Sequence, residues 1–246
     1  MLKVRHITTG YGKKQALTDV SFEVAKGKIA LLTGGNGSGK STVLKAIYGL
    51  LKPWSINHRE HEEHREKLTS ASSAPSVVEK GKVLFEGNDI TALPVSEMIR
   101  RGIVYMPQKK NVFEEFTVEE NLQTSAGIYS GQEAKERMKK VFEILPMLET
   151  MRKRTPFHLS GGEKQLLAFG NVLVHSPKLI LLDEPFAGVD VANSEILRNC
   201  IAGLNGKGVT FIIVEHKRQL LDSIVNQVIE LELGTLKQNI DYGQNN

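Results

Sequence analysis

Eight consecutive residues, Gly34-Gly35-Asn36-Gly37-Ser38-Gly39-Lys40-Ser41, constrain the fold of this 246-residue chain more than any other segment. They match the pattern G-x-x-x-x-G-K-[ST], in which a glycine-rich loop aims backbone N–H groups at phosphate oxygens. An apolar run, Ile29 to Thr33, leads into the loop, and a helix is predicted from Ser41 to Leu50. The sequence therefore predicts an α/β fold with a phosphate site at a strand-to-helix turn.

The residue types of this loop suit a nucleoside triphosphate. Lys40 would neutralise the β- and γ-phosphates, and the hydroxyl of Ser41 would bind Mg²⁺. A glycine-rich turn without a ligand is the alternative, but the Lys-Ser pair between strand and helix favours phosphate. The predicted nucleotide contacts in and beside the loop are Gly35, Asn36, Gly37, Ser38, Gly39, Lys40, Ser41 and Thr42.

Two carboxylates, Asp183 and Glu184, directly follow the apolar run Leu179 to Leu182. Because this run is continuously apolar, it predicts a strand covered on both faces. The carboxyl ends of parallel strands form the ligand-binding edge of such sheets. Asp183 is the predicted magnesium ligand, and Glu184 is predicted to polarise the attacking water. An apolar strand that ends in Asp-Glu is a weak signal by itself.

Short apolar runs alternate with amphipathic stretches along the whole chain, which predicts an α/β fold with a mostly parallel sheet. Further helices are predicted near Asn193 to Leu204 and over His216 to Ser223. Apolar side chains on one face also predict a helix from Gln132 to Leu148. The predicted strands are Leu2 to Ile7, Val20 to Val24, Ile29 to Thr33, Val83 to Phe85, Ile103 to Met106, Leu179 to Leu182, Val209 to Val214 and Gln227 to Leu233.

The predicted organisation is one domain of residues 1–246. Residues 117–156 have no strand signal and are predicted to form a helical subdomain, set into an α/β core of residues 1–116 and 157–246. Residues 54–80 are rich in His and Glu and then in Ser, which predicts an exposed insertion. Its histidines, at helical spacing, could hold a metal, although a solvated charged segment is the favoured interpretation: His58, His61 and His64.

The segment Leu159-Ser160-Gly161-Gly162-Glu163 precedes a predicted helix with an apolar face. Ser160 and Glu163 have the spacing of a capping box, which by itself explains these two residues. The paired glycines need another reason, because they would let the backbone approach a phosphate closely at a second helix N-terminus.

Taken together, these motifs resemble those of the ATP-binding cassette family over nearly the whole chain. The phosphate loop is similar to the family's Walker A motif, Leu159 to Glu163 to its signature motif, and Leu179 to Glu184 to its Walker B motif. Two departures from the usual pattern, Gly35 and Val191 where proline is common, touch no catalytic atom. Four single residues resemble, in the family's order, the adenine-stacking aromatic, the Q-loop glutamine, the D-loop aspartate and the switch histidine: Tyr11, Gln108, Asp190 and His216.

The resemblance implies a P-loop ATPase core with an N-terminal antiparallel β region. It also implies hydrolysis of ATP with Mg²⁺, in a homo- or heterodimer where each signature segment covers the nucleotide of the other subunit. The implied catalytic residues are Glu184, His216, Lys40 and Gln108, and the implied metal ligands are Ser41, Gln108 and Asp183. The implied nucleotide contacts outside the phosphate loop are Tyr11, Ser160, Gly161, Gly162, Glu163 and Asp190.

The implied partners are a second ATPase subunit, transmembrane permease subunits and, for an importer, a substrate-binding protein. The implied location is cytoplasmic, on the inner face of the cell membrane. Similarity to the ATPases of branched-chain amino-acid importers lies in Gln15 to Val20, Asn111 to Phe113 and Thr117 to Leu122. A lipid or lipopolysaccharide export ATPase and a soluble ATPase of the iron–sulfur assembly type are the alternatives.

Composition excludes other classes of protein. The net charge is +4 and no block of Lys and Arg dominates one element, so we expect no nucleic-acid partner. A single cysteine, Cys200, excludes an internal disulfide and agrees with a reducing compartment. No apolar run approaches the roughly 20 residues of a membrane helix, and Met1 to Arg5 does not resemble the start of a signal peptide. Any membrane function is therefore expected to depend on a partner.

Overall fold

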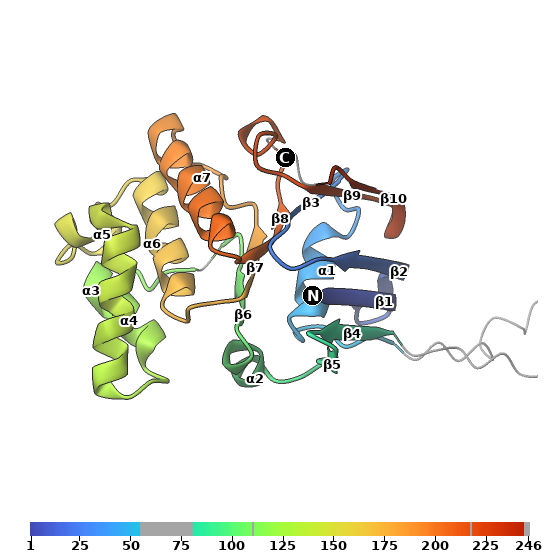
Figure 1. Ribbon diagram of the computed structural model, residues 1–246, viewed down its shortest axis with the longest axis horizontal. Coiled ribbons are helices and arrows are strands. Elements are labelled where there is room, and N and C mark those ends of the chain that lie inside the picture. The colour runs from blue at the N-terminus through green and yellow to red at the C-terminus, as the bar shows by residue number, and fades with distance from the viewer. Residues whose placement is uncertain (55–80, 110, 217, 244–246) are drawn as a thin grey trace, which may run out of the picture.

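The computed structural model describes residues 1–54, 81–109, 111–216 and 218–243, and it contains two sheets and a group of helices (Figure 1). The larger sheet has six strands in the order β10-β9-β3-β8-β7-β6, all parallel except β10, which runs antiparallel to β9. The mostly parallel sheet predicted from the sequence is confirmed. Its strands are β3 (Ile29–Gly34), β6 (Ile103–Met106), β7 (Leu179–Asp183), β8 (Thr210–Val214), β9 (Gln227–Glu232) and β10 (Thr235–Asp241).

The smaller sheet is antiparallel, has the order β2-β1-β4-β5 and includes the N-terminus. The antiparallel β region expected at the N-terminus is therefore present. Its first two strands form a hairpin with several register shifts. The strands are β1 (Leu2–Tyr11), β2 (Lys14–Val24), β4 (Lys82–Phe85) and β5 (Asn88–Asp89).

The helices lie on both sides of the six-stranded sheet, and those of the middle of the chain gather at one end of the molecule (Figure 1). Helix α6 packs against α3, α5, α7 and β6, so it connects the helical end of the molecule to the sheet. The helices are α1 (Lys40–Ile47), α2 (Val95–Arg100), α3 (Val118–Ala126), α4 (Gly131–Ile144), α5 (Pro146–Thr150), α6 (Gly161–Leu173) and α7 (Val191–Gly206), with 3₁₀ turns at Pro156–His158 and Arg218–Leu220.

Two helix predictions are wrong. The helix expected over Gln132 to Leu148 is divided, because Pro146 lacks an N–H and starts a new helix, α5, after Leu145 leaves the helical conformation. The helix expected over His216 to Ser223 is only a 3₁₀ turn at Arg218–Leu220 among its described residues. That segment has few apolar positions to bury, and Leu221 is its anchor in the core.

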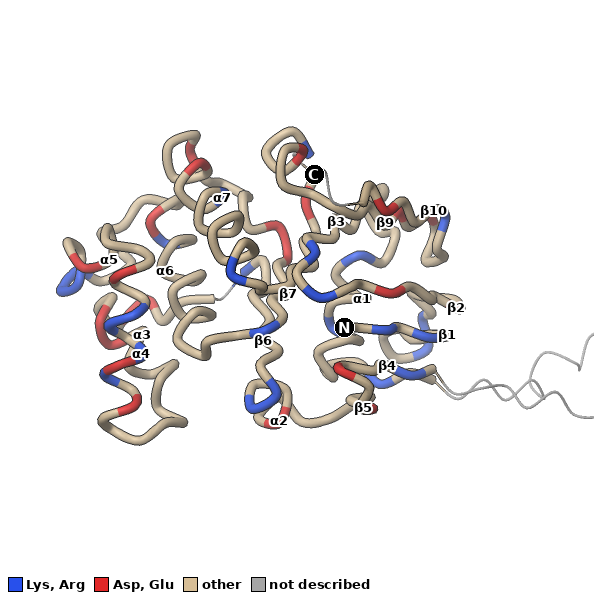
Figure 2. Tube along the Cα trace, viewed as in Figure 1, with Lys and Arg blue, Asp and Glu red and all other residues tan. Residues whose placement is uncertain are grey.

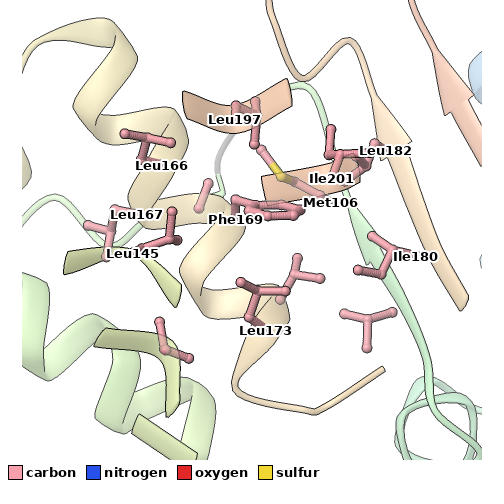
Figure 3. Close-up of a cluster of buried hydrophobic side chains, with 14 of the residues drawn as sticks. Met106, Leu145, Leu166, Leu167, Phe169, Leu173, Ile180, Leu182, Leu197 and Ile201 are labelled. Atoms are coloured by element: carbon pink, nitrogen blue, oxygen red, sulfur yellow. The ribbon is translucent and has the colours of Figure 1, made fainter. Parts of the chain in front are cut away.

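The core beside the helical end is formed where apolar side chains of α6, α7 and β7 face one another (Figure 3). Phe169 of α6 is fully buried and points toward the same space as Ile180 of β7 and Ile201 of α7. Every residue of β7 is buried, as its continuous apolar run predicts. This packing fixes the position of β7, the strand that ends in Asp183.

The two ends of the undescribed segment 55–80 are both held by β1. The backbone N–H of Trp54 donates to the carbonyl of Thr8, at 2.8 Å. The chain returns at β4, whose Lys82 lies opposite Arg5 of β1. The insertion predicted over residues 54–80, with its three histidines, otherwise lies outside the described residues.

Charged residues of both signs alternate along the surface of the helices, as α4 illustrates (Figure 2). Its Glu133 and Arg137 form one ion pair at 2.9 Å, and Lys139 and Glu143 form another at 3.9 Å. Among the described residues, no helix combines the length and apolar character needed to cross a bilayer.

Candidate nucleotide site

The candidate site lies where neighbouring parallel strands of the larger sheet end. Because Met106 pairs with Leu182 and Asp183 pairs with Val214, strands β6, β7 and β8 reach the same edge. Strand β3, beside β8, leads into the phosphate loop at this edge. The strand ends therefore bring the loop together with Gln108, Glu184 and His216, as the sequence predicts.

The phosphate loop has the backbone geometry that its glycines allow. Gly34, Gly37 and Gly39 have φ angles of 142°, 77° and 98°, and Gly39 caps α1. A β-carbon on Gly34 would lie 2.2 Å from the carbonyl oxygen of Leu231, so only glycine fits there. The loop thus turns tightly at the N-terminus of α1, where anions are stabilised by free N–H groups.

Lys40 lies inside the loop. Its Nζ donates to the carbonyl oxygens of Gly34 and Gly35, at 3.0 and 2.9 Å. Burial lowers the pKa of Lys40, while the carboxylates of Glu184 and Asp183 act in the opposite direction. An anion in the loop would compete with the two carbonyls for this ammonium group.

The residues of the loop fit a bound triphosphate. The hydroxyl of Ser38 is buried and has no hydrogen-bond partner among the described residues. A buried polar group without a partner is costly, so this hydroxyl suits a site where a ligand completes its bonding. Predicted contact Thr42 is buried in the first turn of α1, while Asn36 is exposed on the loop.

The two predicted metal ligands are in contact. The hydroxyl of Ser41 donates to Oδ1 of Asp183 at 2.8 Å, although the two residues are far apart in sequence. The second carboxylate oxygen, Oδ2, accepts a hydrogen bond from the hydroxyl of Tyr105 at 3.1 Å. Oxygen donors of this kind are the ligands that Mg²⁺ prefers, so the pair fits that ion.

Glu184 follows directly and is bonded on both oxygens. The amide nitrogen of Gln108 lies 2.5 Å from Oε2, and Nε2 of His216 lies 3.3 Å from Oε1. Glu184 has a φ of 50°, a conformation that non-glycine residues seldom adopt. Its backbone N–H donates to Val214 at the end of β8, which holds the residue in that conformation. Glu184, predicted to polarise the attacking water, is thus in contact with Gln108 and His216, the implied Q-loop and switch residues.

Tyr11, the implied adenine-stacking residue, ends β1 with its ring about half exposed. Nζ of Lys45, in α1, lies 5.6 Å from the ring centroid and 3.3 Å from the hydroxyl. The ring therefore stands beside the helix that follows the phosphate loop, with area free for a flat partner.

The signature segment forms the capping box that its sequence predicts. Ser160 caps α6 and accepts a hydrogen bond from the N–H of Glu163, while the Glu163 carboxylate accepts one from the N–H of Ser160. The paired glycines also have a packing role. A β-carbon on Gly161 would lie 2.9 Å from the carbonyl oxygen of Gly188, and one on Gly162 would lie 2.6 Å from side-chain atoms of α7's first turn.

The D-loop aspartate is part of that contact. Asp190 caps α7, and its carboxylate accepts hydrogen bonds from the backbone and side-chain nitrogens of Asn193, at 3.0 and 2.7 Å. These bonds lower the pKa of Asp190. The signature segment and the D-loop therefore form one unit. Over the residues that the structure describes, this unit shares no hydrogen bond or ion pair with the phosphate loop.

Two residues at the site were missed by sequence reasoning. Tyr105 donates to Asp183, and burial together with that carboxylate raises its pKa above the ordinary range, so the phenol keeps its proton. The buried carboxylate of Glu215 accepts hydrogen bonds from the backbone of Phe186 and His216, at 3.3 and 2.8 Å. It thus ties the turn after Glu184 to the turn that carries the histidine. The sequence signal that could have identified Tyr105 and Glu215 is their position at strand ends, close to Gln108 and His216.

Three features define a P-loop ATPase cassette. A glycine-rich loop follows β3 of the parallel sheet, and two carboxylates lie at the end of β7, two strands away. The third feature is a separate helix that begins with the capped signature segment. The family model described as ABC transporter matches residues 17–187. The chain belongs to the ABC transporter family, as an ATP-binding, ATP-hydrolysing subunit.

Known proteins of the family match nearly the whole chain. A "High-affinity branched-chain amino acid transport ATP-binding protein BraG" from Pseudomonas aeruginosa is 34% identical over 96% of this chain and 91% of its own length. A "Lipopolysaccharide export system ATP-binding protein LptB" from Haemophilus influenzae is 30% identical over 90% of this chain and 83% of its own length. The cassette MJ0796, solved as a dimer bound to ADP and Pi, is similar with a TM-score of 0.78, 25% identity and coverage of 99% of both chains.

Proposed function

We propose that this chain forms a dimer around two Mg²⁺-ATP and that each signature segment completes the nucleotide site of the other subunit. The observation that carries the proposal is the separation within one chain of the signature unit from the phosphate loop. Ser160 is exposed at the N-terminus of α6, where free N–H groups of the helix suit an anion, yet it shares no hydrogen bond with the described phosphate loop. A likeness to a cassette solved as a dimer with ADP and Pi supports the same arrangement.

We assign the nucleotide to residues from both subunits. In one subunit the phosphates would lie on residues 35–42, with Lys40 neutralising the β- and γ-phosphates and Tyr11 stacking on adenine. From the other subunit, Ser160, the two glycines and Glu163 would approach the γ-phosphate, with Asp190 beside them. Ser41, Asp183 and Gln108 would hold Mg²⁺, which when bound neutralises charge on the β- and γ-phosphate oxygens.

Glu184 is the proposed general base. Its carboxylate would accept a proton from the attacking water as the oxygen of that water bonds to the γ-phosphorus and ADP departs. Gln108 and His216 already contact this carboxylate, so they can orient it, and His216 can donate toward the γ-phosphate. Binding would require the bonds of Lys40 to the loop carbonyls to be exchanged for bonds to phosphate.

The path to a membrane partner begins at Gln108. After it, the side chain of Asn111 lies 3.3 Å from Gln165 of α6, and Asn171 of α6 donates to the Asn111 carbonyl. Movement of the Q-loop is thereby linked to the helix that carries the signature segment. Helix α6 belongs to the proposed core of residues 1–116 and 157–246, and it packs against α3 and α5 of the proposed helical subdomain, residues 117–156.

A groove of about 270 Å³ lies beside this link and is the proposed docking site of a transmembrane permease subunit. Its rim includes Phe113, which is 52% exposed and stacks near Phe116 with the ring centroids 5.5 Å apart. Exposed aromatic side chains around a groove are typical of a protein-binding site. The apolar residues lining it include Val104, Met106, Val112, Phe113, Ala168 and Val172.

The proposed transport reaction is import of a branched-chain or similar amino acid, with a substrate-binding protein as a further partner. The identity to the branched-chain amino-acid ATPase BraG supports this reaction. The identity to LptB supports export of a lipopolysaccharide as the second candidate. In either system the chain would act from the cytoplasmic face of the membrane, bound to its permease.

The dimer is tested with Glu184→Gln, which should retain ATP without hydrolysing it. Sedimentation with Mg²⁺-ATP should show a dimer, and ADP should leave a monomer. Adding Ser160→Arg to the same chain should abolish the dimer but keep nucleotide binding. A monomer with ATP in Glu184→Gln would contradict the proposal. Co-purification of the tagged chain with a multi-span permease from membranes, and the class of that permease, would distinguish import from export.

A further inference from the structure

The carboxylate of Asp183 is fixed from two sides. Ser41 donates to Oδ1 at 2.8 Å and Tyr105 donates to Oδ2 at 3.1 Å. Asp183 is only 4% exposed, so solvent offers little alternative bonding. Because each oxygen has its own hydroxyl donor, rotation of the carboxylate plane would break both hydrogen bonds.

Tyr105 is itself held by the helix that carries Ser41. It lies on β6, one strand from β7, and pairs there with Leu181. Its ring packs against Tyr48 at the end of α1, with the centroids 5.6 Å apart. Ser41 at the start of α1 bonds to Asp183, and Tyr48 at its end packs on Tyr105, so both ends of α1 are tied to this corner of the site.

The same segment also serves the next carboxylate. Gln108, three residues after Tyr105, donates to Glu184, while Tyr105 donates to Asp183. One strand end therefore supplies one donor to each of two consecutive carboxylates. Only Gln108 was expected from the sequence to have a role there.

We propose that Tyr105 is a positioning residue for magnesium, whose hydroxyl keeps the Asp183 carboxylate turned toward Ser41. The inference rests on the proposed role of Ser41 and Asp183 as the metal-binding pair. The aromatic ring alone satisfies the packing against Tyr48, whereas the hydroxyl bonds to Asp183. Replacing Tyr105 by Phe therefore removes the positioning bond and leaves the ring.

The test compares Tyr105→Phe with the matched control Tyr48→Phe. Each variant loses one hydroxyl in the same corner, and of these two hydroxyls it is that of Tyr105 that donates to Asp183. A fluorescent ATP analogue reports nucleotide affinity with and without Mg²⁺, and titration with Mg²⁺ gives the half-saturating concentration. We expect this concentration to rise roughly tenfold in Tyr105→Phe, as for loss of one hydrogen bond to a charged group. Nucleotide affinity without Mg²⁺ and Tm should match those of the wild type, and Tyr48→Phe should titrate as the wild type does.

Two results would overturn the inference. One is an unchanged Mg²⁺ titration in Tyr105→Phe. The other is an equal loss of nucleotide affinity with and without Mg²⁺, which would indicate a structural role only. Asp183→Asn separates this failure from failure of the metal site itself. If Asp183→Asn also titrates as the wild type does, the assignment of Mg²⁺ to Ser41 and Asp183 is wrong.

Discussion

The amide nitrogen of Gln108 lies 2.5 Å from Oε2 of Glu184, so the Q-loop holds the proposed general base directly. The other oxygen of this carboxylate faces Nε2 of His216. With both oxygens bonded, Glu184 is oriented but is also restrained by neighbours. Release of one bond would free an oxygen for a water molecule, which makes the Q-loop a natural place for control of hydrolysis.

Glu184→Gln should lower the rate of ATP hydrolysis by roughly 10²-fold to 10⁴-fold, the usual contribution of a general base. The substitution keeps the shape of the side chain and its capacity to bond to Gln108, so ATP affinity should change little. Phosphate release and equilibrium binding measure the two quantities. Glu230→Gln is the control, because Glu230 pairs with Lys237 on the β9–β10 hairpin and should leave the rate unchanged. Wild-type turnover in Glu184→Gln would refute the role of Glu184.

His216→Ala should lower kcat by about 10²-fold, as for removal of one donor that stabilises charge in the transition state. The Nε2 of His216 lies 3.3 Å from Glu184, the residue proposed to act on the water that attacks the γ-phosphate. His6→Ala is a matched control, since His6 bonds to Asp19 in the antiparallel sheet. Steady-state kinetics give kcat for both variants. Equal kcat values for His216→Ala and His6→Ala would exclude a catalytic role for His216.

Gly162→Ala should destabilise the fold by about 1–2 kcal/mol. A β-carbon there would lie 2.6 Å from side-chain atoms of Asp190 and Asn193, so the cap of α7 must move. Gly203→Ala, within helix α7, has no atom within 4 Å of its new β-carbon and should instead stabilise the fold by roughly 0.5–1 kcal/mol. Urea denaturation compares the two, and opposite signs are expected. A Gly162→Ala chain as stable as Gly203→Ala would show that the contact has no energetic weight.

His175 should make stability depend on pH. Burial lowers its pKa to about 4, and the positive charge of Arg137 acts in the same direction. An unfolded histidine has a pKa near 6.5, so between these values the unfolded chain binds more protons than the folded chain. The free energy of unfolding should therefore fall as the pH is lowered from about 6.5 to about 4. Because the ring is partly exposed, we expect a loss of roughly 1–2 kcal/mol.

Denaturation at pH 7 and pH 4.5 measures this effect. His175→Gln should reduce the difference between the two pH values, because it removes the titrating ring while keeping a polar group near Tyr129, whose hydroxyl lies 3.1 Å from Nδ1. An unchanged pH dependence in this variant would assign the effect to other groups.

The sequence predicted those parts of the site whose residues are consecutive. The phosphate loop carries its own geometry, because glycine, lysine and serine types at fixed spacing suit one backbone path. The carboxylates after β7 followed from a continuous apolar run. Tyr105 and Glu215 could not be predicted in the same way, since Tyr105 bonds to Asp183 of β7 and Glu215 bonds to Phe186 in the turn after β7. Only the pairing of β6, β7 and β8 brings those partners together.

In the fold, too, features set by local sequence patterns were predicted, and features set by pairing between distant segments were not. The mostly parallel sheet was predicted from apolar patterns and the N-terminal antiparallel region from the family resemblance, and both are present. The helix predicted over His216 to Ser223 is wrong. Its polar and apolar residues alternate as in an amphipathic helix, but the segment has too few apolar side chains to bury. Strand β10 was missed because its residues are mostly exposed and its place depends on hydrogen bonds to β9. Propensity alone carries no information about such pairing.

Strand β1 offers a site for protein engineering. Trp54 bonds to Thr8 and Lys82 pairs with Arg5, so the chain leaves and rejoins the smaller sheet within a few residues of the same strand. Both attachment points are on β1 of the antiparallel sheet, whereas Glu184 follows β7 of the larger sheet. A foreign module, such as a fluorescent reporter or an affinity handle, could be grafted between them with short linkers, because closing a loop whose ends are already held together costs little entropy.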